Sequence, residues 1–106
     1  MEIFINGASV KAEIDFSHPD HFWLIRDESD GATWTNVSGM ANAFLTQEEA
    51  EIFIAKEKFE EKAVAKCFSW HDLPHVLGPY FQALIVKNPI ESSSYRIFPL
   101  DTKLIK

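Results

Sequence analysis

The sequence predicts an α+β domain in which two helices pack on a single mixed, mainly antiparallel sheet. Short apolar or alternating runs, each bounded by turn residues, predict strands in both halves of the chain. Two segments with helix-start signals interrupt the later strands, which gives the order β-β-β-β-α-β-α-β-β. The 106 residues suit one domain over 1–106, without an internal linker, repeat or low-complexity segment.

The first element is a β-hairpin over residues 2–16. Asn6-Gly7 is the strongest signal for it, because both residues tolerate the positive φ that a type I′ turn requires. A two-residue loop there gives the pairs Ile5 with Ala8, Ile3 with Val10, and Glu2 with Lys11. One face of the hairpin is then apolar and carries Ile3, Ile5, Ala8, Val10, Ala12, Ile14 and Phe16.

A second hairpin is predicted around Asp30-Gly31, joining strands at about 22–28 and 32–38. The continuous apolar run at 22–25 is typical of a strand that is covered on both faces. Residues 40–44 are expected to lead into the first helix. The register of this hairpin sets Leu24 against Val37 and Asp27 against Trp34.

The first helix is predicted from Gln47 to about Lys58. Thr46 and Glu49 form a capping box, in which the Thr46 hydroxyl accepts from the Glu49 amide and the Glu49 carboxylate reaches back to the Thr46 amide. The helix has two apolar sides, and we expect another element of the domain to cover the second one, the alternative being another chain. The first side carries Ala50, Phe53 and Ile54, and the second carries Ile52 and Phe59.

The rest of the chain contains three strands and one short helix. The strands are predicted at 63–68, 82–87 and 95–98, with a polar loop at 90–94 and a short tail at 101–106. The helix lies between the first two of these strands. Ser69 is its expected N-cap, Pro74 fits its first turn, and Gly78-Pro79 ends it.

Charge and hydropathy exclude several classes of function. The net charge of −6 argues against a nucleic-acid-binding domain and against docking on anionic lipid. No apolar stretch is long enough for a membrane span, and the N-terminus lacks a secretory signal pattern, so we expect a cytoplasmic protein. No phosphate-binding loop or other cofactor motif is present, and no cofactor is expected.

Histidine and cysteine provide the best candidates for chemistry. His18 and His21 form one close pair and His71 and His75 another, with Cys67 and Asp72 near the second pair. Pro74 interrupts the second pair and the first pair falls in a loop, so chance histidines are favoured over a metal site. Cys67 falls inside a predicted strand, where a buried, unreactive thiol is expected. A small metal- or thiol-dependent enzyme that uses Cys67, His71, Asp72 and His75 is the alternative.

The aromatic residues favour a binding role. Tryptophan and tyrosine are enriched at interaction hot spots, although core packing explains most rings in most domains. The preferred hypothesis is a non-enzymatic interaction domain, with a protein partner or with self-association through a sheet edge or the Ile52 side of the first helix. An acidic antagonist of a basic protein is a further alternative, motivated by the net charge. The candidate binding residues are Trp34, Trp70, His71 and Tyr80.

From Phe44 onward the order of features resembles a known family. The first feature is a helix start that contains Phe44, the acidic run 48–51 and Phe53. It is followed by a strand at 63–68, an element with Leu73 and Leu77, and a strand at 83–87 that ends in Asn88-Pro89. This resembles the N-terminal domain of SseB-type bacterial proteins, the serine-sensitivity-enhancing group, and small bacterial domains of unknown function on the same plan. The likeness covers about residues 44–100, while the amino-terminal hairpin departs from the usually helical start of that family. The family supplies no catalytic residue, so the resemblance implies a bacterial, cytoplasmic, non-catalytic α+β domain.

Overall fold

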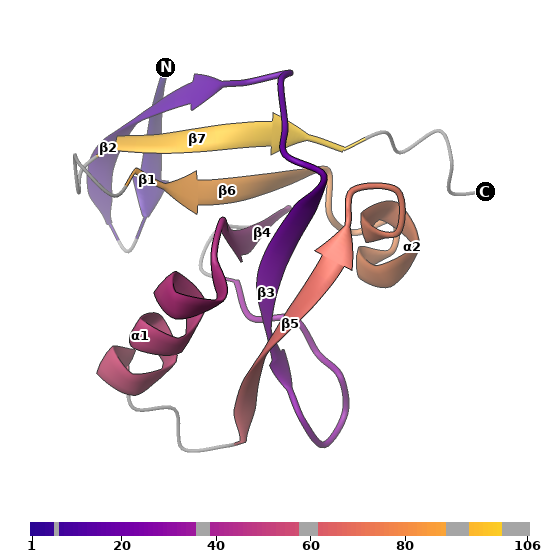
Figure 1. The fold of residues 1–106 in the computed structure, drawn as a ribbon. Coiled ribbons are helices and arrows are strands. Elements are labelled where there is room, and N and C mark those ends of the chain that lie inside the picture. The colour runs from indigo at the N-terminus through magenta and orange to yellow at the C-terminus, as the bar shows by residue number, and fades with distance from the viewer. Residues whose placement is uncertain (6, 36–38, 58–61, 89–93, 101–106) are drawn as a thin grey trace.

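The computed structural model describes residues 1–5, 7–35, 39–57, 62–88 and 94–100, which form one seven-stranded sheet and two helices (Figure 1). The sheet order is β1-β2-β7-β6-β4-β3-β5. The fold class and the order of strands and helices are as predicted from the sequence. The elements are β1 Glu2–Ile5, β2 Ala8–Ile14, β3 His21–Asp27, β4 Met40–Phe44, α1 Gln47–Glu57, β5 Ala63–Ser69, α2 Leu73–Leu77, β6 Ala83–Lys87 and β7 Ser94–Pro99.

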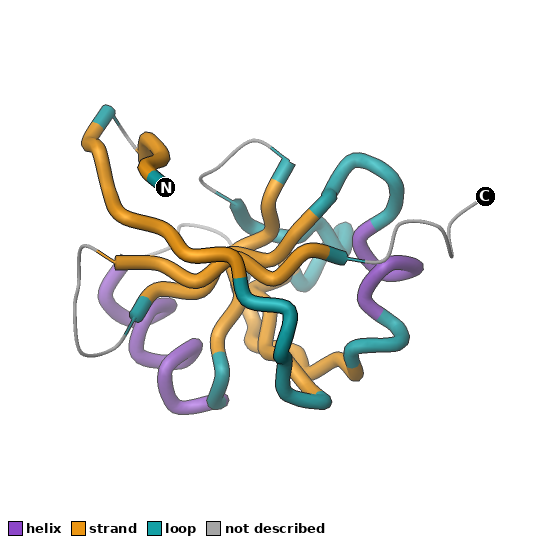
Figure 2. Tube along the Cα trace, turned by 90° about the horizontal axis from the view of Figure 1, so that it is seen from above, coloured by secondary structure: helices purple, strands orange, loops and turns teal. Residues whose placement is uncertain are grey.

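The sheet is mixed and mainly antiparallel. The β2–β7 and β6–β4 pairs are parallel, and the other four pairs are antiparallel. The sheet twists strongly, and the two helices lie on opposite sides of the molecule in both views (Figures 1 and 2). Neither described helix is long and apolar enough to cross a membrane.

The first hairpin has the predicted register, with Ile5 opposite Ala8 and Glu2 opposite Lys11. Gly7 supplies the expected positive φ of 81°, and Asn6 lies outside the described residues. The predicted apolar face is only partly buried. Ile14 and Phe16 are 52% and 81% exposed, although Ile14 is paired with Ile97 of β7.

The second predicted hairpin forms only in part: the chain turns back at Asp30-Gly31, where the Trp34 amide donates to the Ile25 carbonyl, but the predicted register is wrong. Within the described part of the chain, residues 32–35 make one isolated bridge, between Arg26 and Thr33, and the fourth strand is instead Met40–Phe44. The expected Asp27–Trp34 pairing is therefore shifted by two residues, and Val37 lies outside the described residues. The physical reason is the turn. The carboxylates of Asp27 and Asp30 accept from the Ser29 and Ala32 amides, and this builds a wider turn than a two-residue loop allows.

Helix α1 begins as predicted, with the Glu49 amide donating to the Thr46 hydroxyl at 3.2 Å. Ala50 is fully buried. We expected another element of the domain to cover the second apolar side of α1, but Ile52 on that side is 58% exposed. The reason is that α1 contacts the sheet through its other side. Phe59 and Lys58 lie outside the described residues.

Helix α2 is short and ends at Gly78 as predicted. Its N-cap is Asp72, not Ser69, because β5 extends through Ser69 and the helix starts three residues later than expected. The two faces of the sheet carry separate clusters. One holds Phe22, Leu24, Ala41, Ala43, Leu73, Leu77, Leu84, Val86, Phe98 and Leu100; the other holds Ile5, Ala12, Ala83, Ile85 and Ile97.

Candidate functional site

One candidate site lies where the loop before β3 meets the loop after β5, and we call residues 18–21 and 69–75 the Trp70 corner. The Trp70 amide donates to the Asp20 carbonyl at 2.7 Å. The Trp70 ring stacks on the His18 ring with centroids 3.9 Å apart and an angle of 16°. The same indole lies 5.8 Å from the Phe22 ring and packs against the core. Trp70 therefore fixes two surface loops to each other and to the sheet.

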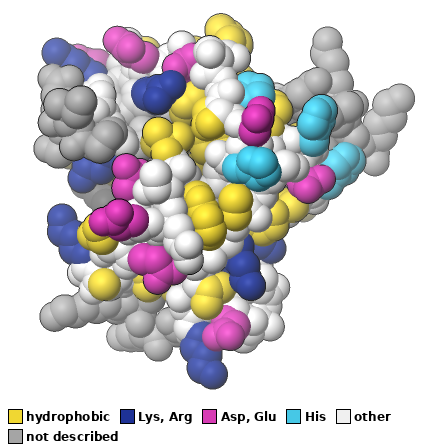
Figure 3. Space-filling model, viewed as in Figure 1, with side chains coloured by type: hydrophobic (Ala, Val, Ile, Leu, Met, Phe, Trp, Pro, Cys, Tyr) yellow, Lys and Arg dark blue, Asp and Glu magenta, His cyan; other side chains and the backbone are white. Residues whose placement is uncertain are grey.

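Histidines surround this corner. His21 pairs with Ser69 across β3 and β5, and His71 and His75 are exposed on either side of the start of α2. The surface view shows histidine side chains gathered on one side of the molecule, where Figure 1 places α2 (Figure 3). Among the described residues, no three His, Cys, Asp or Glu side chains form a group that could hold a metal ion.

The structure separates the four predicted binding residues into two regions. Trp70 and His71 lie at the start of α2, and Tyr80 follows the end of this helix with 85% of its surface exposed. Trp34 lies elsewhere, because its ring packs against Phe53 of α1 at 4.9 Å. Trp34 therefore supports α1 and does not join the other three residues.

Cys67 is exposed, which corrects the expectation of a buried thiol. It lies in β5, an edge strand of the described sheet, and is paired with Trp23 of β3. Side chains alternate along a strand, so Cys67 points to the face opposite Phe68, which packs against the core. A predicted strand position therefore did not fix burial, because an edge strand leaves part of one face uncovered.

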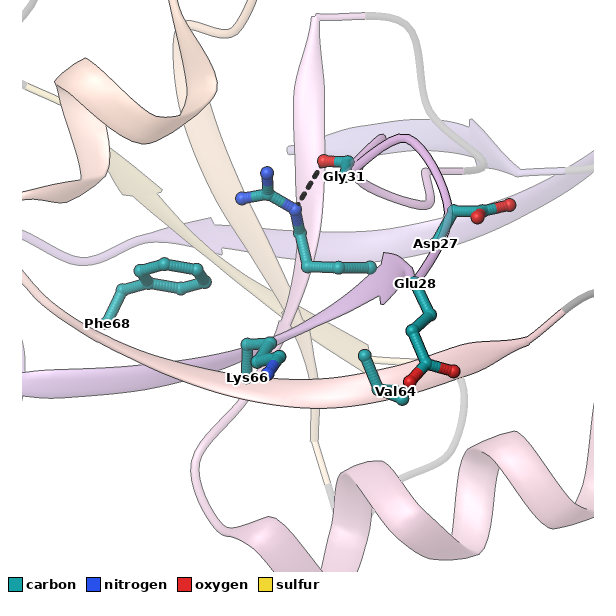
Figure 4. Close-up of a pocket in the computed structure, with 7 residues that line it drawn as sticks. Asp27, Glu28, Gly31, Val64, Lys66 and Phe68 are labelled. Carbon is teal, nitrogen blue, oxygen red and sulfur yellow. Dashed lines mark hydrogen bonds between the residues drawn. The ribbon is translucent and has the colours of Figure 1, made fainter.

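A second candidate site was not predicted from the sequence. It is a cavity of about 370 Å³ between the 27–31 turn and β5 (Figure 4). The Arg26 Nε donates to the Gly31 carbonyl at 2.6 Å, and the guanidinium carbon lies 5.4 Å from the centre of the Phe68 ring. One signal could have found it: Arg26 shares a strand face with buried Leu24. The lining residues are Arg26, Asp27, Glu28, Gly31, Val64, Lys66 and Phe68.

Two other groups have shifted pKa values. The hydrogen bond from Arg96 lowers the pKa of the Asp15 carboxyl below its ordinary 3.8, and the Ser17 amide lowers it further. Burial raises the pKa of the Tyr95 hydroxyl above its ordinary 10.0. Both groups lie on the β2–β7 half of the sheet, so neither belongs to the two candidate sites.

Comparison of the chain with protein-family models, with curated proteins and with solved structures gave no match. The resemblance to SseB-type proteins therefore stays a prediction from the sequence.

Proposed function

We propose that this chain is a non-enzymatic protein-interaction domain and that it binds its partner through Trp70, His71 and Tyr80. The observation that carries this proposal is the exposure of Tyr80, which is 85%, at one end of a helix whose other end is fixed by Trp70. A tyrosine ring that stays in water leaves a large apolar area uncovered, and tyrosine and tryptophan are enriched among the residues that dominate binding energy.

The rigidity of the surface supports the proposal. Trp70 is held by a backbone hydrogen bond, by the stack on His18 and by contact with Phe22. An ordered side chain loses less conformational freedom on binding, so more of its contact energy appears as affinity. The neighbouring histidines add hydrogen-bonding groups around the rings, a mixture of apolar centre and polar rim that is usual at protein interfaces.

Self-association is a second candidate, and the exposure of Ile52 favours it. Ile52 lies on α1 with 58% of its surface uncovered. The two helices lie on opposite sides of the molecule (Figures 1 and 2). A second copy that covered Ile52 would bury a side of α1 that the described part of the chain leaves open. The two candidates use different helices, so one set of variants separates them.

The experiment begins by finding the partner with the full-length chain. A photo-cross-linking amino acid placed at position 80 captures the neighbour in cells, and the same amino acid at position 4 is the matched control, since Phe4 is 72% exposed on β1. Affinity for the purified partner is then measured by calorimetry. We expect Tyr80→Ala to weaken binding about tenfold or more, as for a hot-spot residue, and Phe4→Ala to leave it unchanged.

Two outcomes would overturn the proposal. One is a partner that binds Tyr80→Ala and His71→Ala as tightly as the unchanged chain. The other is a dimer in light scattering that Ile52→Ser dissociates, with no cross-link formed at position 80.

A further inference from the structure

Arg26 lies on a face of β3 on which the two preceding residues, Phe22 and Leu24, are apolar. In the β3–β5 pairing, Phe22 lies opposite Phe68, Leu24 opposite Lys66, and Arg26 opposite Val64. Alternation along β3 places Arg26 on the same face as Phe22 and Leu24, which are fully buried in the core cluster on that face. A guanidinium on this face needs hydrogen-bond acceptors to offset the water that it loses.

The fold supplies only part of what this guanidinium requires. Its Nε donates to the Gly31 carbonyl, and the Phe68 ring packs beside it. Its Nη1 is shielded from solvent and has no acceptor among the described residues. An arginine side chain carries five N–H donors, and a buried donor without an acceptor is unfavourable because it has lost its hydrogen bonds to water. A carboxylate is the acceptor that matches the guanidinium fork most closely.

The cavity beside Arg26 has room for a small ligand. Its volume of about 370 Å³ is at the lower end of the range usual for small-molecule sites. Phe68 and Val64 supply apolar walls, and Lys66 is a second cation in the lining. In Figure 4 the Asp27 carboxylate points away from Phe68 and Lys66. Asp27 also accepts from the Ser29 amide at 2.7 Å, so the nearest carboxylate in the sequence serves the turn.

The lining combines two cations with apolar walls, which favours an anion that has an apolar part. Arg26 and Lys66 attract an anion, whereas Asp27 and Glu28 at the other side repel one. A dianion such as phosphate doubles both the attraction and the repulsion, and it has no apolar part to place against the walls of the cavity. A carboxylate with a short apolar body satisfies the cations and fits the Val64 and Phe68 walls.

We propose that the cavity between the 27–31 turn and β5 binds a small organic carboxylate, whose oxygens accept hydrogen bonds from the Arg26 guanidinium, with Lys66 as a second cation. Because Nη1 is shielded, binding moves the guanidinium or the turn slightly to bring this nitrogen to the ligand. The carboxylate belongs to a free metabolite or to the end of a peptide, and the chemistry at Arg26 is the same for both. This site is separate from the surface proposed for the protein partner.

The test is an NMR titration of the ¹⁵N-labelled full-length chain, followed at the Arg26 Nε–H and at the Gly31 and Phe68 amides. The probes are butyrate, butylamine of the same length, inorganic phosphate, and a short acetylated peptide ending in valine as the free acid or the amide. We expect saturable shifts with butyrate, with the free-acid peptide or with both, and weaker or no shifts with phosphate. Butylamine and the amide peptide should give none. The dissociation constant is expected in the millimolar range for so small a ligand.

Variants assign the binding to the cavity. Arg26→Gln should weaken binding at least tenfold, and Lys66→Gln should weaken it less. Lys87→Gln, on an exposed residue at the end of β6, is the matched control and should leave binding unchanged. If Arg26→Gln does not fold, Arg26→Lys keeps the charge without the fork and should still bind about tenfold more weakly.

Binding by butyrate alone identifies a free carboxylate as the ligand, and binding by the peptide acid alone identifies a chain end. Equal binding of acid and amide, shifts that never saturate, or full affinity in a folded Arg26 variant would overturn the proposal. Tyr80→Ala should bind butyrate normally, so this site and the protein-binding surface can fail independently.

Discussion

Arg26 and Arg96 occupy similar surroundings in two halves of the sheet, and among the described residues only Arg96 has a carboxylate as its hydrogen-bond partner. Both extend from the face that carries the core cluster around Phe22, and each lies beside a phenylalanine ring, at 5.4 Å for Arg26 and 4.8 Å for Arg96. Arg96 donates to the Asp15 carboxylate at 2.6 Å. Arg26 donates to a backbone carbonyl and keeps a buried donor without an acceptor in the described chain. The Arg96–Asp15 pair is thus the kind of interaction that the carboxylate of the proposed ligand would form with Arg26.

The topology explains the difference. Strand β2 runs parallel to β7, and the Asp15 amide donates to the Ile97 carbonyl at 2.8 Å, which holds the Asp15 carboxylate beside Arg96. The carboxylate nearest to Arg26 in sequence is Asp27, but adjacent residues of a strand point to opposite faces. Arg96 therefore receives its partner from a distant part of the chain, whereas the Asp27 carboxylate beside Arg26 in the sequence accepts from the Ser29 amide.

The largest expected effect is at the two rings beside the arginines. Phe98 is fully buried, so Phe98→Ala should lower the free energy of unfolding by about 3–5 kcal/mol. Phe68 is partly buried, and Phe68→Ala should cost about half as much. Urea denaturation measures both values. Equal losses would mean that the Arg26 side is packed as densely as the Arg96 side, which would contradict the difference proposed between the two arginines.

Phe16→Ala is the control for the loss of an aromatic ring as such. Phe16 is 81% exposed, and its removal should change the free energy of unfolding by less than about 0.5 kcal/mol.

Gly31→Ala tests how tightly the turn holds Arg26. Gly31 has a φ of +73°, and a Cβ there would lie 3.3 Å from Nη2 of Arg26. Gly7 is the matched control, because its φ is +81° and nothing lies within 4 Å of its Cβ position. We expect each substitution to cost about 1–2 kcal/mol for the left-handed backbone, and Gly31→Ala to cost more than Gly7→Ala. The excess should vanish when both variants are made in an Arg26→Met chain. An excess that survives would show that the contact with Arg26 does not matter.

Local signals predicted most of the fold, and they failed where a distant partner decides the outcome. Asn6-Gly7 fixed a hairpin register because a two-residue turn leaves one pairing. Asp30-Gly31 carries the same kind of signal, yet the described residues 32–35 make one bridge with β3, and the strands that flank β3 are β4 and β5, whose apolar residues complete the core. No local pattern distinguishes these two cases.

The candidate sites show the same limit. Trp70 could be singled out in the sequence as an aromatic residue at the start of a short element near His71 and Tyr80, but its stack on His18 depends on how the loop before β3 packs. The Arg26 cavity depends on a turn and an edge strand that are far apart in sequence. The sequence shows that Arg26 follows the apolar run 22–25. That its Nη1 has no acceptor among the described residues is a property of the packed structure.

Arg26→Met should leave stability nearly unchanged or raise it by up to about 1 kcal/mol. The substitution removes a buried donor without an acceptor, which offsets the loss of the hydrogen bond to Gly31. Arg96→Met should lower stability, because it leaves the Asp15 carboxylate without its cation. Thermal unfolding of both variants at neutral pH measures the contrast. A marked loss of stability in Arg26→Met would show that the fold itself uses this arginine fully.

The smallest effect is expected from the acid titration of the Asp15–Arg96 pair, which is partly exposed. The pKa of Asp15 is lower in the folded chain than its ordinary 3.8, so the unfolded chain binds the proton more tightly. The stabilisation is therefore complete above about pH 4 and is lost as the pH falls through the folded value. Asp15→Asn should remove this part of the acid dependence, and Asp20→Asn, at an exposed carboxylate, should retain it. Urea midpoints between pH 6 and pH 2 measure the difference, which 1 M NaCl should reduce because salt screens exposed charges. Identical acid profiles for the chain with and without Asp15 would mean that Arg96 is no better paired than Arg26.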